Sequence, residues 1–208
     1  GDTLLEVGTI DFIGGSVVGG TSNVDFNATS NMSEFADGVT LNADLNLTGS
    51  NDHFEIQNGL TLNGTANLSG YSSQLDFAGT QSFGASSGQT ATVEMGEYNT
   101  KLQVTDGGTL TLESTVTVVG EGIVTGSGTG DAIINNGLIH ANLNNANIIL
   151  SPETFTNTGT LRASNNGGLS LKNDWDNNGT IELDSGRLYL YGDNATADLN
   201  QSSFVRVG

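Results

Sequence analysis

One pattern occurs three times between residues 133 and 191: IINNGLIHA (Ile133–Ala141), FTNTGTLRA (Phe155–Ala163) and WDNNGTIEL (Trp175–Leu183). The copies align on Gly137, Gly159 and Gly179, so that one copy follows the next after about 21 residues. This alignment places apolar residues in shared columns, one of them Ile133, Phe155 and Trp175 and another Ile139, Leu161 and Ile181. A period that is both short and regular predicts one coil of a solenoid per copy.

The spacing inside each copy predicts strands. Apolar positions lie two residues apart, as Ile139 and Ala141 do, which sends their side chains to one face of a strand. The intervening column of His140, Arg162 and Glu182 should then face outward. Residues 142–146, 164–168 and 184–187 are rich in turn formers and should connect the strands. Parallel coils would repeat every position about 4.8 Å further along the axis, which hairpins would not do.

A column of asparagines accompanies the glycines. Asn135, Asn157 and Asn177 each lie two residues before one of them. Stacked amides at a coil corner bond to one another along the axis, so that none is buried without a partner. The alternative is that asparagine simply suits a turn. We expect the ladder, because three coils agree.

The repeats extend over most of the chain. Residues 35–77 contain a second repeat, FADGVTL followed by IQNGLTL, with an offset of about 21 residues. There the apolar positions follow the glycine by one and three residues rather than two and four, so the corner geometry should change along the rod. GEGIVTGSGTGD, residues 120–131, reads as a loop insertion. Together these features predict an all-β chain that forms a single β-solenoid domain over residues 1–208, with roughly nine or ten coils of about 21 residues.

The charge of the chain limits its partners. The 208 residues include 23 acidic and five basic ones, for a formal net charge of −18. Such a charge opposes binding to nucleic acid and to anionic membrane surfaces. No apolar run is long enough for a membrane span, and the absence of cysteine excludes disulfides and thiolate chemistry. The last residues, LNQSSFVRVG, form no polar cap, so we expect the chain to be part of, or a subunit in, something longer.

No arrangement of side chains predicts catalysis. Five scattered basic residues are a poor supply for a lyase that acts on acidic sugars. Carboxylate pairs suited to a hydrolase are numerically available, namely Asp174 and Asp176 with Asp184, or Asp193 with Asp198, but proximity is common among 23 acids. His53 and His140 have no evident second ligand and are expected on strand surfaces. We therefore expect no enzyme, no catalytic residues and no organic cofactor.

Calcium is the one metal that the sequence favours. Its oxygen ligands are offered by the loops around Asp131, Asp174 and Asp193. The alternative is diffuse binding of counterions to an acidic surface.

A surface binding patch is predicted near the end of the third copy. Alternation sends Leu188 and Leu190 inward, which leaves Arg187, Tyr189 and Tyr191 on the outer face. Outward tyrosines in line can stack on sugars, but they also occur as ordinary cross-strand partners. Trp175 shares the column of Ile133 and is expected in the core.

FTNTGTLRASNNGGLSL and WDNNGTIELDSGRLYL resemble the repeats of large bacterial secreted proteins of the adhesin type, which include filamentous-haemagglutinin-like and autotransporter passenger proteins. The resemblance covers residues 133–191. It implies a right-handed parallel β-helix that is secreted or displayed at the cell surface as a structural or adhesive scaffold, a filament or matrix component. Expected partners are further copies of the chain, or glycans and proteins of the cell surface or matrix. The alternative is a carbohydrate-binding or polysaccharide-processing β-helix.

Overall fold

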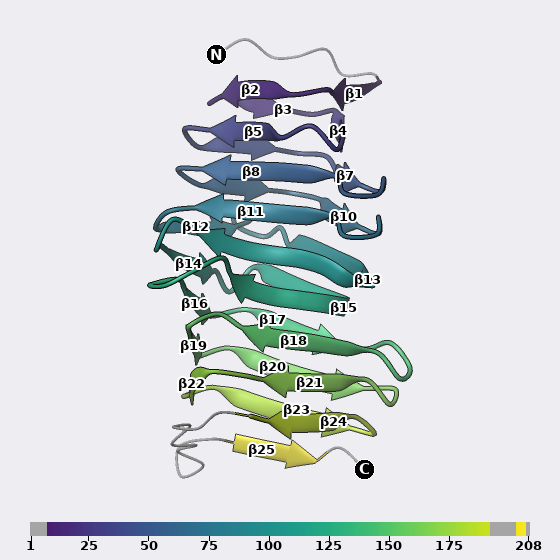
Figure 1. Ribbon diagram of the computed structural model, residues 1–208, viewed down its shortest axis with the longest axis vertical. Coiled ribbons are helices and arrows are strands. Elements are labelled where there is room, and N and C mark those ends of the chain that lie inside the picture. Colours follow the sequence, from purple (N-terminus) through teal and green to yellow (C-terminus); the bar gives the residue numbers. More distant parts are fainter. Residues whose placement is uncertain (1–7, 192–202, 207–208) are drawn as a thin grey trace.

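The computed structural model describes residues 8–191 and 203–206, and every regular element in them is a β-strand. The strands stack in parallel as a β-solenoid of about eight turns (Figure 1). Most turns have three strands, so the solenoid has three sides. In Figure 1 the nearer strands run from right to left while the chain descends, which makes the coil right-handed. The predicted parallel β-helix is confirmed.

The three sides are built from strands that recur in a fixed order. The first side contains β1 (Thr9–Phe12), β4 (Asp25–Ala28), β7 (Leu45–Leu47), β10 (Thr65–Leu68), β17 (Leu138–Ala141), β20 (Thr160–Ser164), β23 (Thr180–Asp184) and β25 (Ser203–Arg206). The second side contains β2 (Gly15–Val18), β5 (Ser33–Ala36), β8 (His53–Gln57), β11 (Gln74–Ala78), β18 (Asn147–Ser151), β21 (Gly168–Leu171) and β24 (Arg187–Leu190).

The third side contains β3 (Thr21–Ser22), β6 (Val39–Leu41), β9 (Leu60–Leu62), β12 (Gln81–Gly84), β14 (Thr109–Leu112), β16 (Ala132–Asn135), β19 (Thr154–Asn157) and β22 (Asp174–Asn177). Two long strands, β13 (Ala91–Thr105) and β15 (Val116–Gly126), run on from the first side to the second. These two coils therefore turn their first corner without leaving the strand conformation.

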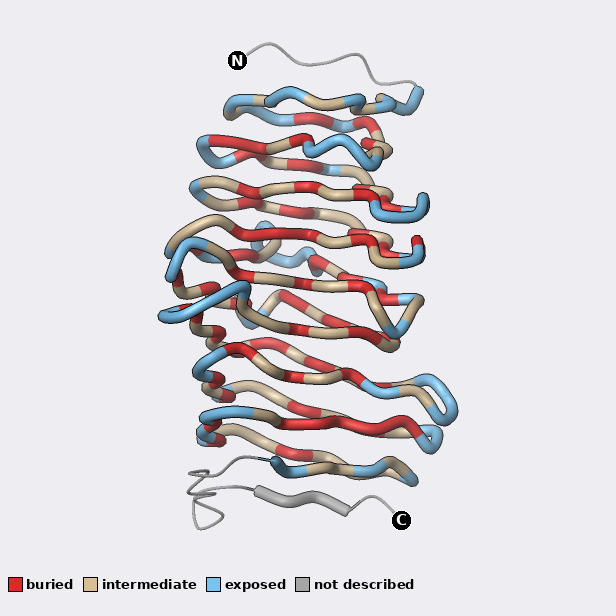
Figure 2. Tube along the Cα trace, in the orientation of Figure 1, coloured by how far each residue is buried: buried red, intermediate tan, exposed pale blue. Residues whose placement is uncertain are grey.

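The register follows the sequence columns. Leu161 pairs with Ile139 on one side and Ile181 on the other, and all three are almost fully buried. Phe155 likewise lies between Ile133 and Trp175. Burial alternates along the strands, with red inward positions separated by tan ones in Figure 2. The core is thus a set of stacked apolar columns, as the repeat predicts.

Phenylalanines fill the core of the first coils. Phe26 contacts Phe12 and Phe35 edge-on, at centroid distances of 5.9 and 5.0 Å, and Phe54 lies 4.7 Å from Phe35. Such edge-to-face pairs contribute about 0.5–1.5 kcal/mol each beyond the apolar area they bury. The interior of the first coils is therefore rich in paired aromatic rings.

The described residues form about eight turns, whereas nine or ten were predicted for the whole chain, and the turns differ in length. Phe83 pairs with Leu112, and Ala66 pairs with Val93. In both pairs the partners lie further apart in the sequence than one repeat. The regular period holds only where the clear repeats lie.

Residues 120–126 do not form the loop that was predicted for 120–131. They continue β15, and only residues 127–131 leave the strand. Gly120 (φ 105°) lies so close to the preceding coil that a Cβ would stand 1.9 Å from the Met95 carbonyl oxygen. Glycine is therefore required here for close packing and not for flexibility.

The glycines of the two repeats stand at different corners. Gly38 and Gly59 precede strands of the third side and have positive φ. Gly159 and Gly179 precede strands of the first side, and there a Cβ would lie 2.2 Å from the carbonyl oxygen of the glycine one coil before. This difference explains the shifted spacing of apolar residues after the glycine.

The predicted asparagine ladder is confirmed. Asn135 Nδ2 donates to Asn157 Oδ1 at 2.7 Å, and Asn157 Nδ2 donates to Asn177 Oδ1 at 2.6 Å. All three side chains are buried. The amides thus satisfy one another inside the corner between the third and first sides.

Candidate functional site

The predicted patch lies on the second side of the solenoid. Arg187 and Tyr189 belong to β24, and Tyr191 follows it. Tyr191 is 52% exposed, Tyr189 is half-buried, and Arg187 is exposed and donates from Nη2 to Asn166 Oδ1 at 3.1 Å. The strand alternation therefore brings the three side chains to one outer surface.

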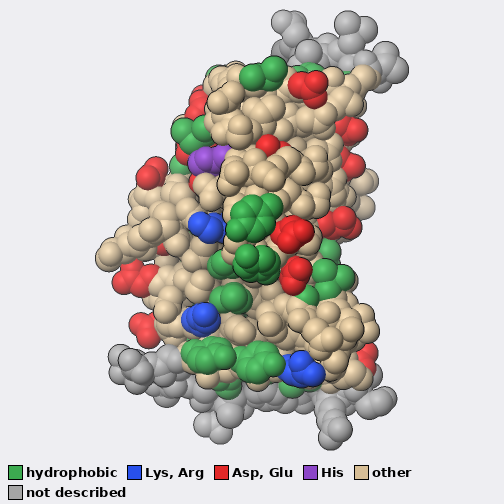
Figure 3. Space-filling model, turned by 45° about the vertical axis from the view of Figure 1, so that its right-hand side comes forward, with side chains coloured by type: hydrophobic (Ala, Val, Ile, Leu, Met, Phe, Trp, Pro, Cys, Tyr) green, Lys and Arg blue, Asp and Glu red, His purple; other side chains and the backbone are tan. Residues whose placement is uncertain are grey.

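Lys172 joins these residues from the coil before. Leu171 pairs with Leu190, so the next residues, Lys172 and Tyr191, are also neighbours. Lys172 Nζ lies 5.8 Å from the centroid of the Tyr191 ring, within the range of a cation–π interaction. We call Lys172, Arg187, Tyr189 and Tyr191 the tyrosine patch. Figure 3 shows hydrophobic and basic side chains together at this end of the molecule.

An apolar column extends from the patch along the axis. From Tyr189 the outward positions of successive coils are Ser170, Ile149, Ile123 and Lys101. Both isoleucines are only partly buried. The sequence repeat already places Ile149, Ser170 and Tyr189 in one outward column, and the pairing confirms it. Ile123 and Lys101 join the column only through the pairing across coils of unequal length, which the repeat does not give.

The basic residues of this surface are unpaired. The ion pairs among the described residues join His53 to Asp76 and Arg162 to Glu182 and Asp184. Lys101, Lys172 and Arg187 take part in none of these, although the chain has 23 acidic residues. Lys172 and Arg187 therefore give the tyrosine patch a positive character on a negative protein, and Lys101 lies on the same side four coils away.

The first coils give the same side the opposite charge. Glu34, Glu55 and Asp76 pair across successive coils at outward positions of the second side. The second side is thus acidic in its N-terminal half and basic in its C-terminal half.

Trp175 and Leu190, two residues near the patch, were both predicted to face the core. Trp175 is 7% exposed, as its column predicts. Leu190 pairs with the buried Leu171 and so keeps the inward column that the alternation predicts, but it is 45% exposed. The cause is that β24 pairs only with β21 in the described part of the chain, so no strand covers Leu190 from the other side.

Of the three calcium candidates, Asp131 and Asp174 are among the described residues, and they have different surroundings. Asp131 is buried, and its carboxylate accepts the backbone N–H groups of Gly108, Ser127 and Gly128, so it closes the loop of residues 127–131. Asp174 is exposed and lines a recess of about 470 Å³ together with Glu153. Asp193 lies outside the described residues. Among those described, no three acidic or histidine side chains are grouped as a metal site would require.

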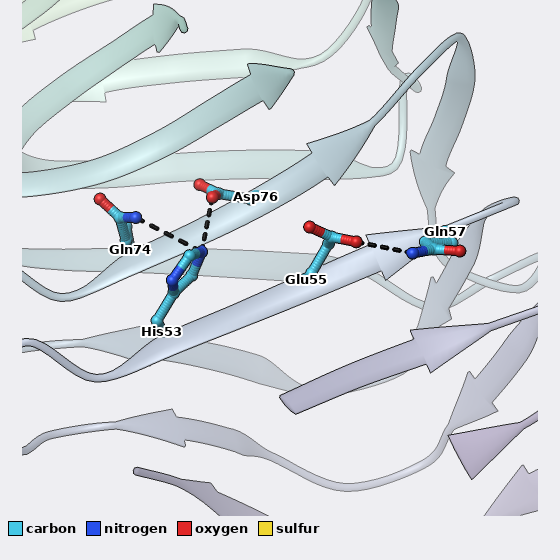
Figure 4. Close-up of polar contacts among 5 residues, drawn as sticks. All are labelled: His53, Glu55, Gln57, Gln74 and Asp76. Carbon is cyan, nitrogen blue, oxygen red and sulfur yellow. Dashed lines mark hydrogen bonds and ion pairs between the residues drawn. The ribbon is translucent and has the colours of Figure 1, made fainter. Parts of the chain in front are cut away.

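His53 is not isolated, contrary to the sequence prediction. Its Nε2 lies 2.6 Å from Asp76 Oδ2 and 3.3 Å from the Gln74 amide, both in the next coil (Figure 4). The hydrogen bond to Asp76 is the main reason that the pKa of His53 is raised above 6.5, and partial burial opposes it. The contact is a cross-coil hydrogen bond with Asp76 buried, and it becomes an ion pair when His53 is protonated.

His140 and Arg162 lie on the first side. His140 Nε2 is 2.8 Å from Ser164 Oγ, and burial, followed by the charge of Arg162, lowers the pKa of His140 below 6.5. Arg162 contacts Glu182 at 3.8 Å and Asp184 at 3.6 Å. The predicted Arg162–Glu182 pair is confirmed as a surface pair, which contributes less than about 1 kcal/mol.

Among the described residues, the suggested carboxylates Asp174, Asp176 and Asp184 lie on two different strands. Asp174 and Asp176 are both exposed in β22, on either side of the buried Trp175, whereas Asp184 belongs to β23 and contacts Arg162. Asp193 and Asp198 lie outside the described residues.

Comparisons with known proteins give no identity. The chain matches no protein-family model, no curated protein and no solved structure. No helix of the described residues is long and apolar enough to cross a membrane.

Proposed function

We propose that this chain is a non-enzymatic extracellular scaffold, secreted or displayed at the cell surface, that is structural or adhesive and binds its partners through the second side of the solenoid. One observation carries the proposal: Lys172 and Arg187, which take part in none of the ion pairs among the described residues, lie beside Tyr189 and the exposed Tyr191 on a chain of net charge −18. Cations and aromatic rings in one surface are typical of binding sites. The stacked core supports such a role, because it holds the surface on a rigid frame.

The chemistry of the patch favours ligands that carry carboxylate or sulfate groups. Arg187 can hold an oxyanion by two N–H groups, and the tyrosine rings offer apolar faces to a sugar ring. Acidic glycans of a cell surface or matrix combine both features.

Binding of the purified chain to immobilised heparin, hyaluronan and polygalacturonate tests the adhesive role. We expect salt-sensitive binding that Arg187→Ala together with Lys172→Ala weakens at least about ten-fold. Arg162→Ala is the matched control, since Arg162 is basic but lies on the first side and is ion-paired. Equal loss in the control would refute the assignment to the patch.

The two charge halves of the second side support self-association. Two copies packed antiparallel would place Glu34 and Glu55 of one copy opposite the tyrosine patch of the other. Sedimentation at rising salt, with Glu34→Gln plus Glu55→Gln as the variant, tests this contact. Electron microscopy shows whether association continues into filaments, and a chain that stays monomeric at high concentration counts against the structural role.

The second candidate, a polysaccharide-processing β-helix, is favoured by the same tyrosines. A reducing-sugar assay and an unsaturated-product assay on the bound glycans separate the two. Release of either product would replace the scaffold by the enzyme.

A further inference from the structure

A notch interrupts the corner between the first and second sides. Along this corner most coils carry a protruding loop, but β15 turns it as a continuous strand (Figure 1). Val119 pairs with His140 and Gly122 with Ile148, so residues 120–121 of β15 stand against residues 141–147 of the next coil. The preceding coil is also longer than β15 at this corner, because it has residues 97–100 where β15 has only Gly122.

Glycines make this short corner sterically feasible. A Cβ on Gly122 would lie 2.3 Å from Met95 Cε and 2.6 Å from Thr100 Oγ1, and Gly120 touches the Met95 backbone. Only a backbone without side chains can approach the previous coil so closely. The corner of β15 therefore recedes behind its neighbours.

The recess is a groove of about 400 Å³ that runs across five successive coils. Its apolar lining includes Met95, Val119 and Leu143, and Leu143 is 41% exposed on the loop after β17. Five coils span roughly 19 Å along the axis, at about 4.8 Å per step. The volume is within the range of ligand sites, and the length suits an extended ligand.

The polar lining consists of uncharged groups except for one. Thr48, Asn67, Ser69 and Asn142 contribute hydroxyl or amide side chains, and Glu94 is the single charged residue. These groups donate to and accept from hydroxyls. Because the only charge is negative, the groove disfavours carboxylated or sulfated ligands.

Two exposed tyrosines stand beside the groove. Tyr71 and Tyr98 follow the lining residues Ser69 and Gly96 by two positions each, and they are 50% and 59% exposed. Their rings meet edge-on, with centroids 6.3 Å apart, and Asn99 Nδ2 donates to the Tyr71 hydroxyl at 3.2 Å. Figure 3, which brings this corner forward, shows hydrophobic side chains beside acidic ones at mid-height.

We propose that this groove, with Tyr71 and Tyr98 at its rim, binds an extended neutral oligosaccharide. A sugar chain presents apolar C–H faces, which fit aromatic rings and Leu143, and hydroxyls, which fit the amides and Glu94. A peptide is a poorer match, because the strands at this corner are paired on both sides and offer no free edge for strand addition. The site is separate from the tyrosine patch in both position and charge.

The test uses the full chain and titration calorimetry with four neutral hexasaccharides, of β-1,4-glucose, β-1,4-N-acetylglucosamine, α-1,4-glucose and β-1,4-mannose. We expect at least one of them to bind with a Kd of about 1 mM or tighter. The α-1,4-galacturonate hexamer, titrated as the acidic counterpart, should bind the groove more weakly. Tyr98→Ala should weaken neutral binding at least about ten-fold, whereas Tyr98→Phe should retain it.

Two further variants keep the result interpretable. Val119→Trp fills the groove and should abolish binding, and Leu143→Ser, on an exposed loop, should weaken it without affecting folding. Tyr191→Ala is the control, since it belongs to the tyrosine patch and should leave neutral binding unchanged. The proposal is overturned if no neutral hexasaccharide binds, if the galacturonate binds more tightly at the groove, or if Tyr98→Ala and Tyr191→Ala lose equally. Acidic-glycan binding that survives Tyr98→Ala would show that the patch stands even where the groove fails.

Discussion

His53 Nε2 and Asp76 Oδ2 are 2.6 Å apart across neighbouring coils, with Asp76 buried and His53 a quarter exposed. His53 pairs in register with Gln74, so Asp76 is its diagonal neighbour, two residues further along the strand. The contact ties β8 to β11 on the outer surface of the second side. It also makes the stability of the fold depend on pH.

We expect His53 to stabilise the folded state at acidic pH. Its pKa is raised by the hydrogen bond to Asp76, so the folded chain holds the proton more tightly than the unfolded chain. The stabilisation is complete below pH 6.5 and is lost as pH rises through the raised value. Urea unfolding of wild type and His53→Gln at several pH values should show a difference that shrinks toward alkaline pH, by about 1 kcal/mol or less for this partly exposed pair. A constant difference would contradict the expectation.

His140 should behave in the opposite way. Burial and Arg162 lower its pKa, so the unfolded chain binds the proton more readily. Its contribution is present above pH 6.5 and is lost as pH falls toward the lowered value. In NMR titrations of the two imidazole rings, the midpoints should fall on opposite sides of 6.5. Midpoints on the same side would show that one of the two environments is wrong.

The asparagine ladder should be costly to interrupt. Asn157→Ala removes both amide–amide bonds and leaves a hole at a fully buried position, so we expect a loss of about 2–4 kcal/mol in the free energy of unfolding. Asn46→Ala is the matched control. Asn46 also makes two ladder bonds, to Asn27 and Asn67, but at an outward position where water can replace them. Its loss should stay below about 1 kcal/mol, and similar losses for both would mean that burial is not what makes the inner ladder matter.

The sequence could predict those parts of the fold in which apolar residues recur at a regular period. Leu161 and Ile181 are neighbours because each must be buried once per turn, and that requirement leaves a regular trace in the chain. Coils of unequal length leave no such trace. Where Phe83 pairs with Leu112 the period is lost, so the repeat does not give the length of that coil.

The candidate sites were harder to predict, because they depend on neighbours from different coils. Arg187 and Tyr189 lie on β24 and Tyr191 directly follows it, so the three were found by alternation alone. Lys172 and Asp76 join their partners only through the register, and Asp76 is shifted by two positions as well. The groove has no sequence motif, since it arises where one coil is shorter than those beside it.

The corner of β15 gives a direct test of the main correction to the sequence prediction. If residues 120–126 formed a flexible loop, alanine would be tolerated at Gly120 as well as at Gly128. In the structure Gly120 has φ of 105° and no room for a Cβ, whereas Gly128 has nothing within 4 Å. We expect Gly120→Ala to destabilise the fold by more than about 3 kcal/mol, from backbone strain together with the clash against Met95, and Gly128→Ala to change it by less than about 0.5 kcal/mol. Urea midpoints of the two variants measure the difference, and equal midpoints would place residue 120 in a loop after all.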